Sequence, residues 1–155
     1  MNIAVLADTH GLLRPEVLPH LRGVDAILHA GDVGDPHILA TLATFAPLHA
    51  IRGNIDTAPE LRHLPETLRL MLGGVQIHLL HDVKTLAFSP QAYGMGVVIS
   101  GHSHRPRVAE ESGVLYLNPG SCGPRRFSLP ISLARLTVSG YGNGGETVEA
   151  QLITL

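Results

Sequence analysis

The sequence predicts an α/β fold in which two β-sheets pack face to face with helices on the outside. Its first third alternates short apolar runs with helical patterns, which is typical of right-handed crossovers in a parallel sheet. The remainder consists mainly of paired apolar runs around glycine-containing turns, which indicates hairpins and a second sheet. With 155 residues, of which 45% are hydrophobic and 15% charged, the chain suits one globular domain over residues 1–155.

The N-terminal third is predicted to contain three strands separated by two helical segments. Ile3 to Ala7 is an unbroken apolar run, as expected for a strand buried on both faces. Asp35 is suited to cap a helix and Pro36 to occupy its first position, and Pro47 ends the helix. The other elements of this part are a helical pattern over 16–21, which Pro19 restricts, and strands over 25–29 and 48–51.

The rest of the chain predicts three hairpins and one further buried strand. The hairpin turns are Gly73-Gly74, Ser112-Gly113 and the glycine-rich segment 139–145. They join strands over 66–72 and 75–80, over 107–111 and 114–117, and over 131–138 and 147–155. A helical stretch from about Lys84 to Tyr93, which Pro90 either interrupts or restarts, precedes an apolar strand over 96–100.

Side chains that can bind metal ions follow five of these strands. They stand in the segments Asp8-Thr-His10, Gly31-Asp32, Gly53-Asn54, His81 and Gly101-His102-Ser-His104. Because ligands in open α/β sheets bind at the carboxyl ends of the strands, we expect Asp8, Asp32 and Asn54 to meet at one edge. Three of the segments place glycine before the polar residue, where the missing Cβ permits a sharp turn or a close backbone approach.

The types of these side chains indicate the kind of metal site. Carboxylate, amide and imidazole ligands without a thiolate suit Mn, Fe, Zn or Ni. Seven candidate ligands are too many for one ion with an open position. They suit two ions that share one carboxylate, which is the arrangement used for phosphoester hydrolysis.

The order of the motifs resembles the calcineurin-like metallophosphoesterase superfamily. The motifs concerned are Asp-x-His, Gly-Asp, Gly-Asn-x-Asp, His and Gly-His-x-His, between Asp8 and His104. The compact size and the segment Asn118-Pro-Gly-Ser121 are similar to the small YfcE-type phosphodiesterase branch of that superfamily. The resemblance implies a four-layer α/β sandwich with two mixed sheets, formed by a single calcineurin-like domain.

The resemblance also implies a role for each candidate ligand. One ion would be held by Asp8, His10, Asp32 and His104. A second ion would be held by Asp32, Asn54, His81 and His102, with Asp32 bridging the two. The implied activity is phosphodiester hydrolysis by a water or hydroxide between the ions, with Asp32, Asn54 and His102 acting in catalysis. Manganese is the first choice of metal, and Fe, Zn and Ni are alternatives.

One position departs from the larger members of the superfamily. They carry histidine after Gly-Asn, where it can protonate the leaving group, whereas this chain has Ile55. The small branch commonly lacks that histidine as well. The departure therefore leaves the source of the proton open, while the predicted fold stands.

Several other residues allow two interpretations. His29 either orients a ligand or is a hydrogen-bonded structural histidine. Asp56 and Asp82 either orient the site residues that they follow or only stabilise turns. Arg125 and Arg126 either hold a phosphate or are solvated surface residues.

Composition excludes some partners. A net charge of −2, 4% aromatic residues and no Trp argue against nucleic-acid binding. No apolar stretch approaches the length of a membrane span, and the single Cys122 has no partner for an internal disulfide, so we expect a cytoplasmic protein without a membrane partner. The resemblance implies a small phosphoester substrate and a homo-oligomer, dimeric or larger. The alternative is a non-catalytic metal-binding scaffold of the same fold, like the retromer subunit, although the complete ligand set favours an enzyme.

Overall fold

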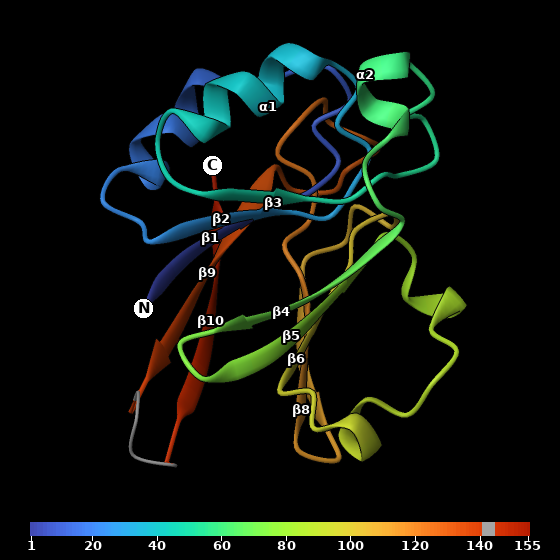
Figure 1. Ribbon diagram of the computed structural model, residues 1–155. Helices are drawn as coiled ribbons and strands as arrows, with labels where there is room; N and C mark the ends of the chain where they lie inside the picture. Colours follow the sequence, from blue (N-terminus) through green and yellow to red (C-terminus); the bar gives the residue numbers. More distant parts are fainter. Residues whose placement is uncertain (141–144) are drawn as a thin grey trace.

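A computed structural model describes residues 1–140 and 145–155 and contains two five-stranded sheets packed face to face (Figure 1). The first sheet has the order β10-β9-β1-β2-β3 and consists of β1 (Asn2–Leu6), β2 (Ala26–His29), β3 (Leu48–Ala50), β9 (Ser132–Ser139) and β10 (Thr147–Thr154). The second has the order β4-β5-β6-β8-β7 and consists of β4 (Thr67–Leu72), β5 (Val75–Leu80), β6 (Val97–Ile99), β7 (Arg107–Glu111) and β8 (Val114–Asn118).

Both sheets are mixed, which confirms the predicted fold class. β1, β2 and β3 are parallel, and β9 and β10 return antiparallel. In the second sheet β5, β6 and β8 are parallel, while β4 and β7 are antiparallel strands at the edges. The contacts of His81 and His104 with Asp8 show that β5 and β6 end at the same edge of the sandwich as β1.

β1 lies in the first sheet and is buried on both of its faces. Ile3 and Val5 belong to the core between the two sheets, and Ala4 and Leu6 belong to the core beneath the helices. This double burial explains why the strand reads as an unbroken apolar run. The apolar run therefore fixes the position of Asp8, which follows it at the sheet edge.

Three helical elements cover the outer face of the first sheet (Figure 1). They are the 3₁₀ helix η1 (Pro15–Leu21), α1 (Pro36–Ala43) and α2 (Pro59–Arg62), and they pack through Val17, Leu21, Ile38, Leu42 and Leu61. The carboxylate of Asp35 accepts a hydrogen bond from the backbone N–H of His37, as predicted for the helix cap. α2 was not predicted, because four residues are too few to produce a helical period.

Among the described residues, the helical elements beside the second sheet are short turns. The stretch expected from Lys84 to Tyr93 forms two 3₁₀ turns, η2 (Val83–Thr85) and η3 (Pro90–Tyr93). Pro90 thus starts a separate piece, which is one of the two alternatives that the sequence allowed. The residue before a proline avoids the helical region, and Ser89 is extended at φ −87° and ψ 107°.

The hairpins lie where the sequence predicts them. β5 and β7 have the predicted bounds, and the other strands differ from prediction by one residue at one or both ends. Of the glycine-rich turn expected over 139–145, residues 141–144 lie outside the described residues. Within residues 1–140 and 145–155, no helix combines the length and hydropathy needed to cross a bilayer.

Candidate metal centre

The loops after β1 and β2 run side by side at the edge of the first sheet. Asp8 N–H donates to the carbonyl of Gly31 at 3.0 Å, and His10 N–H donates to that of Asp32 at 2.9 Å. These two bonds continue the parallel pairing of β1 with β2 beyond the ends of the strands. Asp8, His10 and Asp32 are therefore brought together by backbone contacts as well as by the order of the strands.

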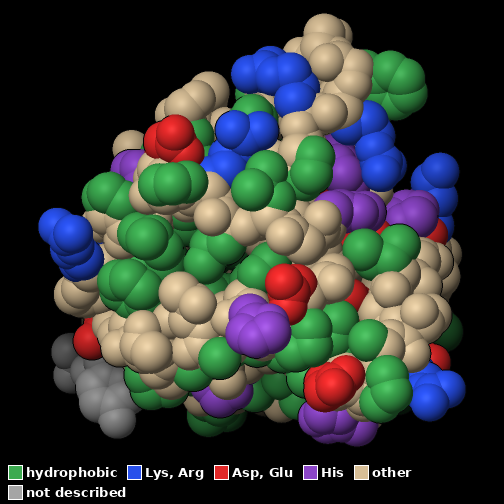
Figure 2. Space-filling view, turned by 90° about the horizontal axis from the view of Figure 1, so that it is seen from above, with side chains coloured by type: hydrophobic (Ala, Val, Ile, Leu, Met, Phe, Trp, Pro, Cys, Tyr) green, Lys and Arg blue, Asp and Glu red, His purple; other side chains and the backbone are tan. Residues whose placement is uncertain are grey.

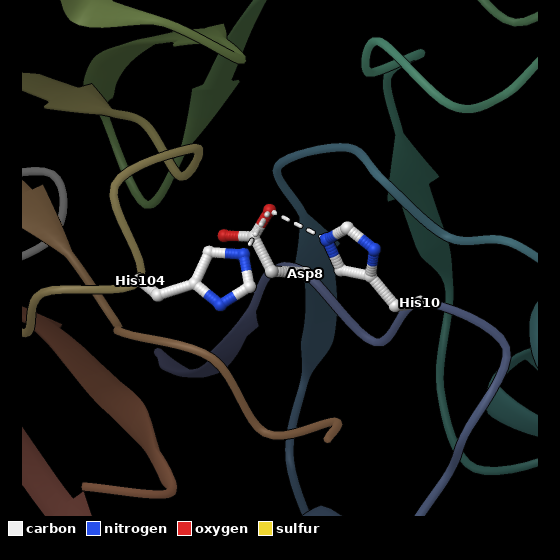
Figure 3. Close-up of side chains that lie close together, drawn as sticks. All are labelled: Asp8, His10 and His104. Atoms are coloured by element: carbon white, nitrogen blue, oxygen red, sulfur yellow. Dashed lines mark ion pairs between the residues drawn. The ribbon is translucent and has the colours of Figure 1, made fainter. Parts of the chain in front are cut away.

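Three contacts join these residues to histidines that follow β5 and β6, and a fourth joins Asp32 to His10. The Oδ1 atom of Asp8 lies 3.9 Å from His81 Nε2 and 3.6 Å from His104 Nε2. Asp32 Oδ2 lies 3.3 Å from His10 Nε2 and 3.2 Å from His81 Nε2. Ligand atoms from both sheets thus converge at one point, and Figure 3 shows Asp8 between His10 and His104.

Two overlapping groups have the spacing of metal ligands. Asp8, His10 and His104 form one group and Asp8, Asp32 and His81 form the other, with ligand atoms within 4.8 Å of one another. Asp32 lies between His10 and His81, the predicted ligands of different ions, as a bridging carboxylate would. Asp8, which the resemblance assigned to the first ion alone, also belongs to both groups.

The ligand atoms lack hydrogen-bond partners of their own. Among the described residues, seven buried side-chain atoms are without such a partner, and five of them belong to Asp8, His10, His81 and His104. A buried polar atom without a partner is costly, and buried carboxylates and imidazoles that converge are satisfied by a shared cation. The residues present therefore fit divalent metal ions, as the motifs imply.

The second nitrogen or oxygen of several ligands is fixed by the backbone. His81 Nδ1 lies 2.7 Å from the carbonyl of Ala30, so it carries the proton and leaves Nε2 free to bind a metal. Asp8 Oδ2 accepts from His102 N–H at 3.0 Å, and Asp32 Oδ1 accepts from Ile55 N–H at 3.1 Å. Each carboxylate is thereby held by one oxygen and directs the other toward the histidines.

The backbone at the site has an unusual conformation. Seven described residues other than glycine have positive φ, and five of them are predicted site residues: Asp8, His10, Asp32, His102 and His104. L-residues avoid this region, and such strain persists where surrounding contacts enforce it, often at functional sites.

The glycines before the site residues permit close contacts. A Cβ on Gly31 would lie 2.7 Å from His81 Nδ1, and one on Gly101 would lie 2.9 Å from Asp8 Oδ2. A Cβ on Gly53 would collide with the backbone N and Oδ1 of Asp32. All three glycines therefore serve the close approach that the sequence suggested.

Asn54 and His102 lie at the rim and not among the converging atoms. The His102 side chain is about half exposed, packs edge-to-face on the His81 ring at 5.2 Å, and has Nε2 3.8 Å from Asp82 Oδ2. Asn54 is exposed and lines a cavity together with His81. Seen from above the helices, histidine side chains gather at one place on the surface, bordered by Lys and Arg side chains (Figure 2).

His29 is a hydrogen-bonded structural histidine that connects the two loops. Its Nδ1 accepts from Gly31 N–H at 3.2 Å, and its Nε2 donates to Thr9 Oγ1 at 3.0 Å, which in turn donates to the carbonyl of Val33. Complete burial lowers the pKa of His29 to about 4, although Asp8 and Asp56 oppose the shift. The ring is therefore neutral at pH 7, as its hydrogen bonds require.

Two acidic residues that follow predicted ligands have positioning roles. The buried carboxylate of Asp56 accepts from the N–H groups of Val33, Gly34 and Gly53, so it holds the loops after β2 and β3 together. Asp82 accepts from Lys84 N–H at the start of η2 and lies close to His102. Arg125 is exposed and donates to the carbonyl of Leu129.

The structure adds roles that the sequence motifs did not reveal. Asn118 Nδ2 donates to the carbonyl of Gly101 and to Ser103 Oγ, and Ser121 Oγ donates to the carbonyl of Asp8 at 2.8 Å. The segment 118–121 therefore fixes the loops that carry His102, His104 and Asp8. Its motif was visible in the sequence, but only the packing of the two sheets shows what it holds.

Electrostatics keep the central carboxylate ionised. Burial by itself would raise the pKa of Asp32. The contacts with His81, the Ile55 N–H and His10 outweigh burial and lower that pKa to about 2.

Burial raises the pKa of the Cys122 thiol to about 12, which makes it unreactive and agrees with the absence of a nucleophile motif around it.

Comparisons with known proteins agree on one family. Residues 1–140 match the calcineurin-like phosphoesterase superfamily domain. A probable metallophosphoesterase from Methanothermobacter thermautotrophicus is 34% identical over 99% of this chain and 92% of its own length. A predicted phosphoesterase from Streptococcus pneumoniae superposes with a TM-score of 0.72 at 25% identity, covering 99% of this chain and 88% of that one. Vacuolar Protein Sorting 29 from Cryptosporidium parvum superposes with a TM-score of 0.78 over 99% of this chain and 98% of that one. The two sequences are 19% identical, so this likeness shows a shared fold and nothing further.

Proposed function

The chain belongs to the calcineurin-like phosphoesterase superfamily, and on that premise we propose that it is a two-metal phosphodiesterase that hydrolyses small phosphoesters. The observation that carries the proposal is the convergence of Asp8, Asp32 and three imidazoles on one point. Within the described residues, the converging atoms of Asp8, His10, His81 and His104 lack hydrogen-bond partners. A non-catalytic protein has no need to keep such a set at the cost of buried polar atoms.

The ligand assignment gives each ion a group of side chains. Asp8, His10, Asp32 and His104 would hold one ion, and Asp32, Asn54, His81 and His102 the other. Two divalent cations there would supply a strong nucleophile at neutral pH and neutralise charge on the phosphate. We propose manganese as the metal, with Fe, Zn and Ni as alternatives.

The chain's own residues supply orientation. The Asn54 amide at the rim would donate a hydrogen bond to a phosphoryl oxygen, and the N–H groups of His102 and Ile55 keep both carboxylates directed inward. His102, beside Asp82 and His81, would face the substrate at the open side of the site.

The direct test is metal analysis of purified protein, combined with a screen of phosphodiesters and phosphomonoesters. We expect two ions per chain and turnover of a diester that chelation abolishes and metal restores. Two bound ions without turnover of any ester would favour the scaffold alternative, for which the likeness to Vacuolar Protein Sorting 29 offers only a shared fold.

The bridging carboxylate gives the sharpest variant. Asp32→Asn should reduce metal content to one ion or fewer and lower kcat/KM by more than the roughly 10–100-fold typical of residues that only support a ligand. Asp35→Asn is the matched control, because asparagine caps a helix as well as aspartate does and the residue lies outside the site. Two ions per chain and normal turnover in Asp32→Asn would contradict the assignment.

We also propose that the protein acts in the cytoplasm as a homo-oligomer, with neither nucleic acid nor membrane as a partner. The single buried Cys122, which has no disulfide partner, supports the compartment. Sedimentation as a monomer at micromolar concentration would exclude the oligomer.

A further inference from the structure

The cavity lined by Asn54 and His81 adjoins the candidate metal centre. It has a volume of about 320 Å³, at the small end of the roughly 300–1,000 Å³ of ligand sites. Its lining comes from the loop after β3, the start of β4, the end of β5 and the loop after β5, and includes Arg52, Asn54, Glu66, Thr67, His81 and Asp82. Asn54 and His81 are also proposed metal ligands, so the cavity opens directly beside the metal centre.

The guanidinium of Arg52 is used to build the cavity wall. Its NH2 nitrogen donates to Glu66 Oε1 at 2.6 Å, and its NH1 nitrogen donates to the carbonyl of Arg62 at 2.7 Å. The backbone N–H of Arg52 donates to the carbonyl of Pro65. Arg52 thus clamps the segment before β4 against the site, and its charge is already neutralised by Glu66.

The charges of the lining residues disfavour an anionic occupant. Arg52 contributes one positive charge, and Glu66 and Asp82 contribute one negative charge each, so the three sum to −1. Away from the metal ions, a second phosphate would meet the carboxylates of Glu66 and Asp82 and one guanidinium that is already paired with Glu66. The cavity is therefore suited to a neutral group.

The polar atoms of the wall favour an occupant with hydroxyl groups. Leu80 is the aliphatic residue of the lining, and it is 2% exposed, so a flat aromatic ring finds little apolar surface. Glu66, Asp82 and Thr67 present oxygen atoms that accept hydrogen bonds, and within the described residues the Thr67 hydroxyl makes no hydrogen bond of its own. Carboxylates and hydroxyls are acceptors for the O–H groups of a sugar.

We propose that this cavity binds a neutral, hydroxyl-rich substituent of the phosphodiester substrate, such as a ribose-type sugar, beside the phosphate held at the metal centre. The proposal rests on the phosphodiesterase activity proposed above. It makes Glu66 and Thr67 substrate-binding residues, and it makes Arg52 a positioning residue that acts through Glu66.

The test compares two substrates with the same leaving group. The p-nitrophenyl ester of uridine 5′-monophosphate carries the ribose diol, and its 2′,3′-dideoxy analogue lacks it. With the manganese-loaded protein, we expect kcat/KM to be at least about tenfold higher for the ester with the diol, since hydrogen bonds to charged groups are the stronger kind. Because both esters release p-nitrophenolate, the difference reports recognition and not leaving-group chemistry.

Variants then locate the recognition. Thr67→Val removes a hydroxyl at nearly constant shape, and Glu66→Gln removes a charge while keeping an acceptor for Arg52. The double variant should lower the preference for the diol ester to about twofold or less, through KM more than kcat. The matched control is Glu149→Gln with Thr154→Val on the exposed edge of β10, which should keep the wild-type preference.

Equal kcat/KM for the two esters would overturn the proposal, and so would a preference that survives in the double variant. In both cases hydrolysis of the aryl diester would still support the phosphodiesterase function. Failure of the metal-loaded protein to hydrolyse either ester would instead contradict the proposed function itself. Circular dichroism and metal content of each variant confirm that the comparison is made on folded, loaded protein.

Discussion

Each left-handed site residue carries a local cost that the rest of the molecule offsets. A non-glycine residue in that region costs of order 1–3 kcal/mol. At Asp8 and Asp32 the cost is offset by hydrogen bonds from neighbouring backbone N–H groups to the carboxylates. Because these donors lie on other loops, the strain persists only while the loops remain assembled.

Ile55 is the residue where this chain departs from the larger enzymes of the superfamily. Its side chain is 43% exposed and offers no proton, while its N–H holds Asp32. We predict that log kcat falls steeply as the leaving group becomes more basic, because a missing general acid costs typically 10²–10⁴-fold. Ile55→His should raise turnover of alkyl diesters more than that of aryl diesters.

The Ile55 experiment has a natural control. Ile55→Leu keeps the backbone N–H and the apolar side chain, so its leaving-group dependence should match that of the wild type. Metal content must be equal in all three proteins. A flat dependence in the wild type, with chemistry limiting turnover, would mean that another group already donates the proton.

His29 predicts how stability depends on pH. The pKa of His29 is about 4 in the folded chain and 6.5 in the unfolded chain. Between these two pH values, His29 is protonated in the unfolded state but neutral in the folded state. The stabilisation is therefore present above pH 6.5 and is lost as pH falls toward 4. Its size is roughly 3 kcal/mol at most, at about 1.4 kcal/mol per pKa unit.

Urea unfolding in the presence of a chelator, at several pH values between 4 and 7, measures this dependence. His29→Gln should give a smaller loss of stability across that range, even though its stability at pH 7 is lower. His63→Gln, which removes an exposed imidazole, should keep the wild-type slope. Equal slopes for wild type and His29→Gln would show that another group is responsible.

At the scale of elements, the loops after the strands determine the geometry of the site. Gly31 illustrates this, because its φ is 95° and an added Cβ would lie 2.7 Å from His81 Nδ1. We predict that Gly31→Ala lowers metal content and activity, since His81 or the loop must shift. Gly23→Ala is the control, because Gly23 also has positive φ, at 74°, but has no atom within 4 Å of the added Cβ.

The two glycine variants separate strain from collision. Both should lose about 1 kcal/mol or more of stability, because alanine is unfavourable at positive φ. Only Gly31→Ala should also lose metal in metal analysis. Normal metal content in a folded Gly31→Ala protein would contradict the role assigned to this close contact.

The sequence predicted most elements because each leaves a local signal. Alternating or continuous apolar runs marked the strands, and Asp35 with Pro36 marked α1. The segment 84–93 forms two 3₁₀ turns, and Pro90 starts the second, as one of the two predicted alternatives had it; the apolar spacing gave no sign of the extended residues between the turns. There, Leu86 and Ser89 both have backbone angles of the extended region.

At the scale of the whole molecule, the metal centre lies at one edge of the hydrophobic core, and none of its ligands belongs to that core. The core between the sheets consists of aliphatic side chains, and the ligands follow the strands. We therefore predict that chelation abolishes activity but leaves the far-UV circular dichroism spectrum nearly unchanged at room temperature. The Tm should fall by about 5–10 °C, because bound metal stabilises the folded state by mass action.

Restoring manganese should return both activity and Tm, which is the control for irreversible damage. Loss of the folded spectrum on chelation at room temperature would show that the metal is part of the folding energy, as in small zinc domains.

The sequence alone determined the candidate ligands, because each stands immediately after an apolar run that had to become a buried strand. It also determined that Asp8, Asp32 and Asn54 follow neighbouring strands, since alternating strands and helices leave few topologies. Chain order and local pattern suffice for these conclusions.

Only the tertiary structure decided which atoms meet. Asp8 belongs to both ligand groups, and its carboxylate is fixed by His102, which is 94 residues away in the chain. Its carbonyl is held by Ser121, which is 113 residues away. The cavity beside Asn54 likewise exists because Arg52 reaches Glu66 across a turn of the fold. Such contacts depend on how distant segments of the chain pack, and the local sequence pattern does not predict that packing.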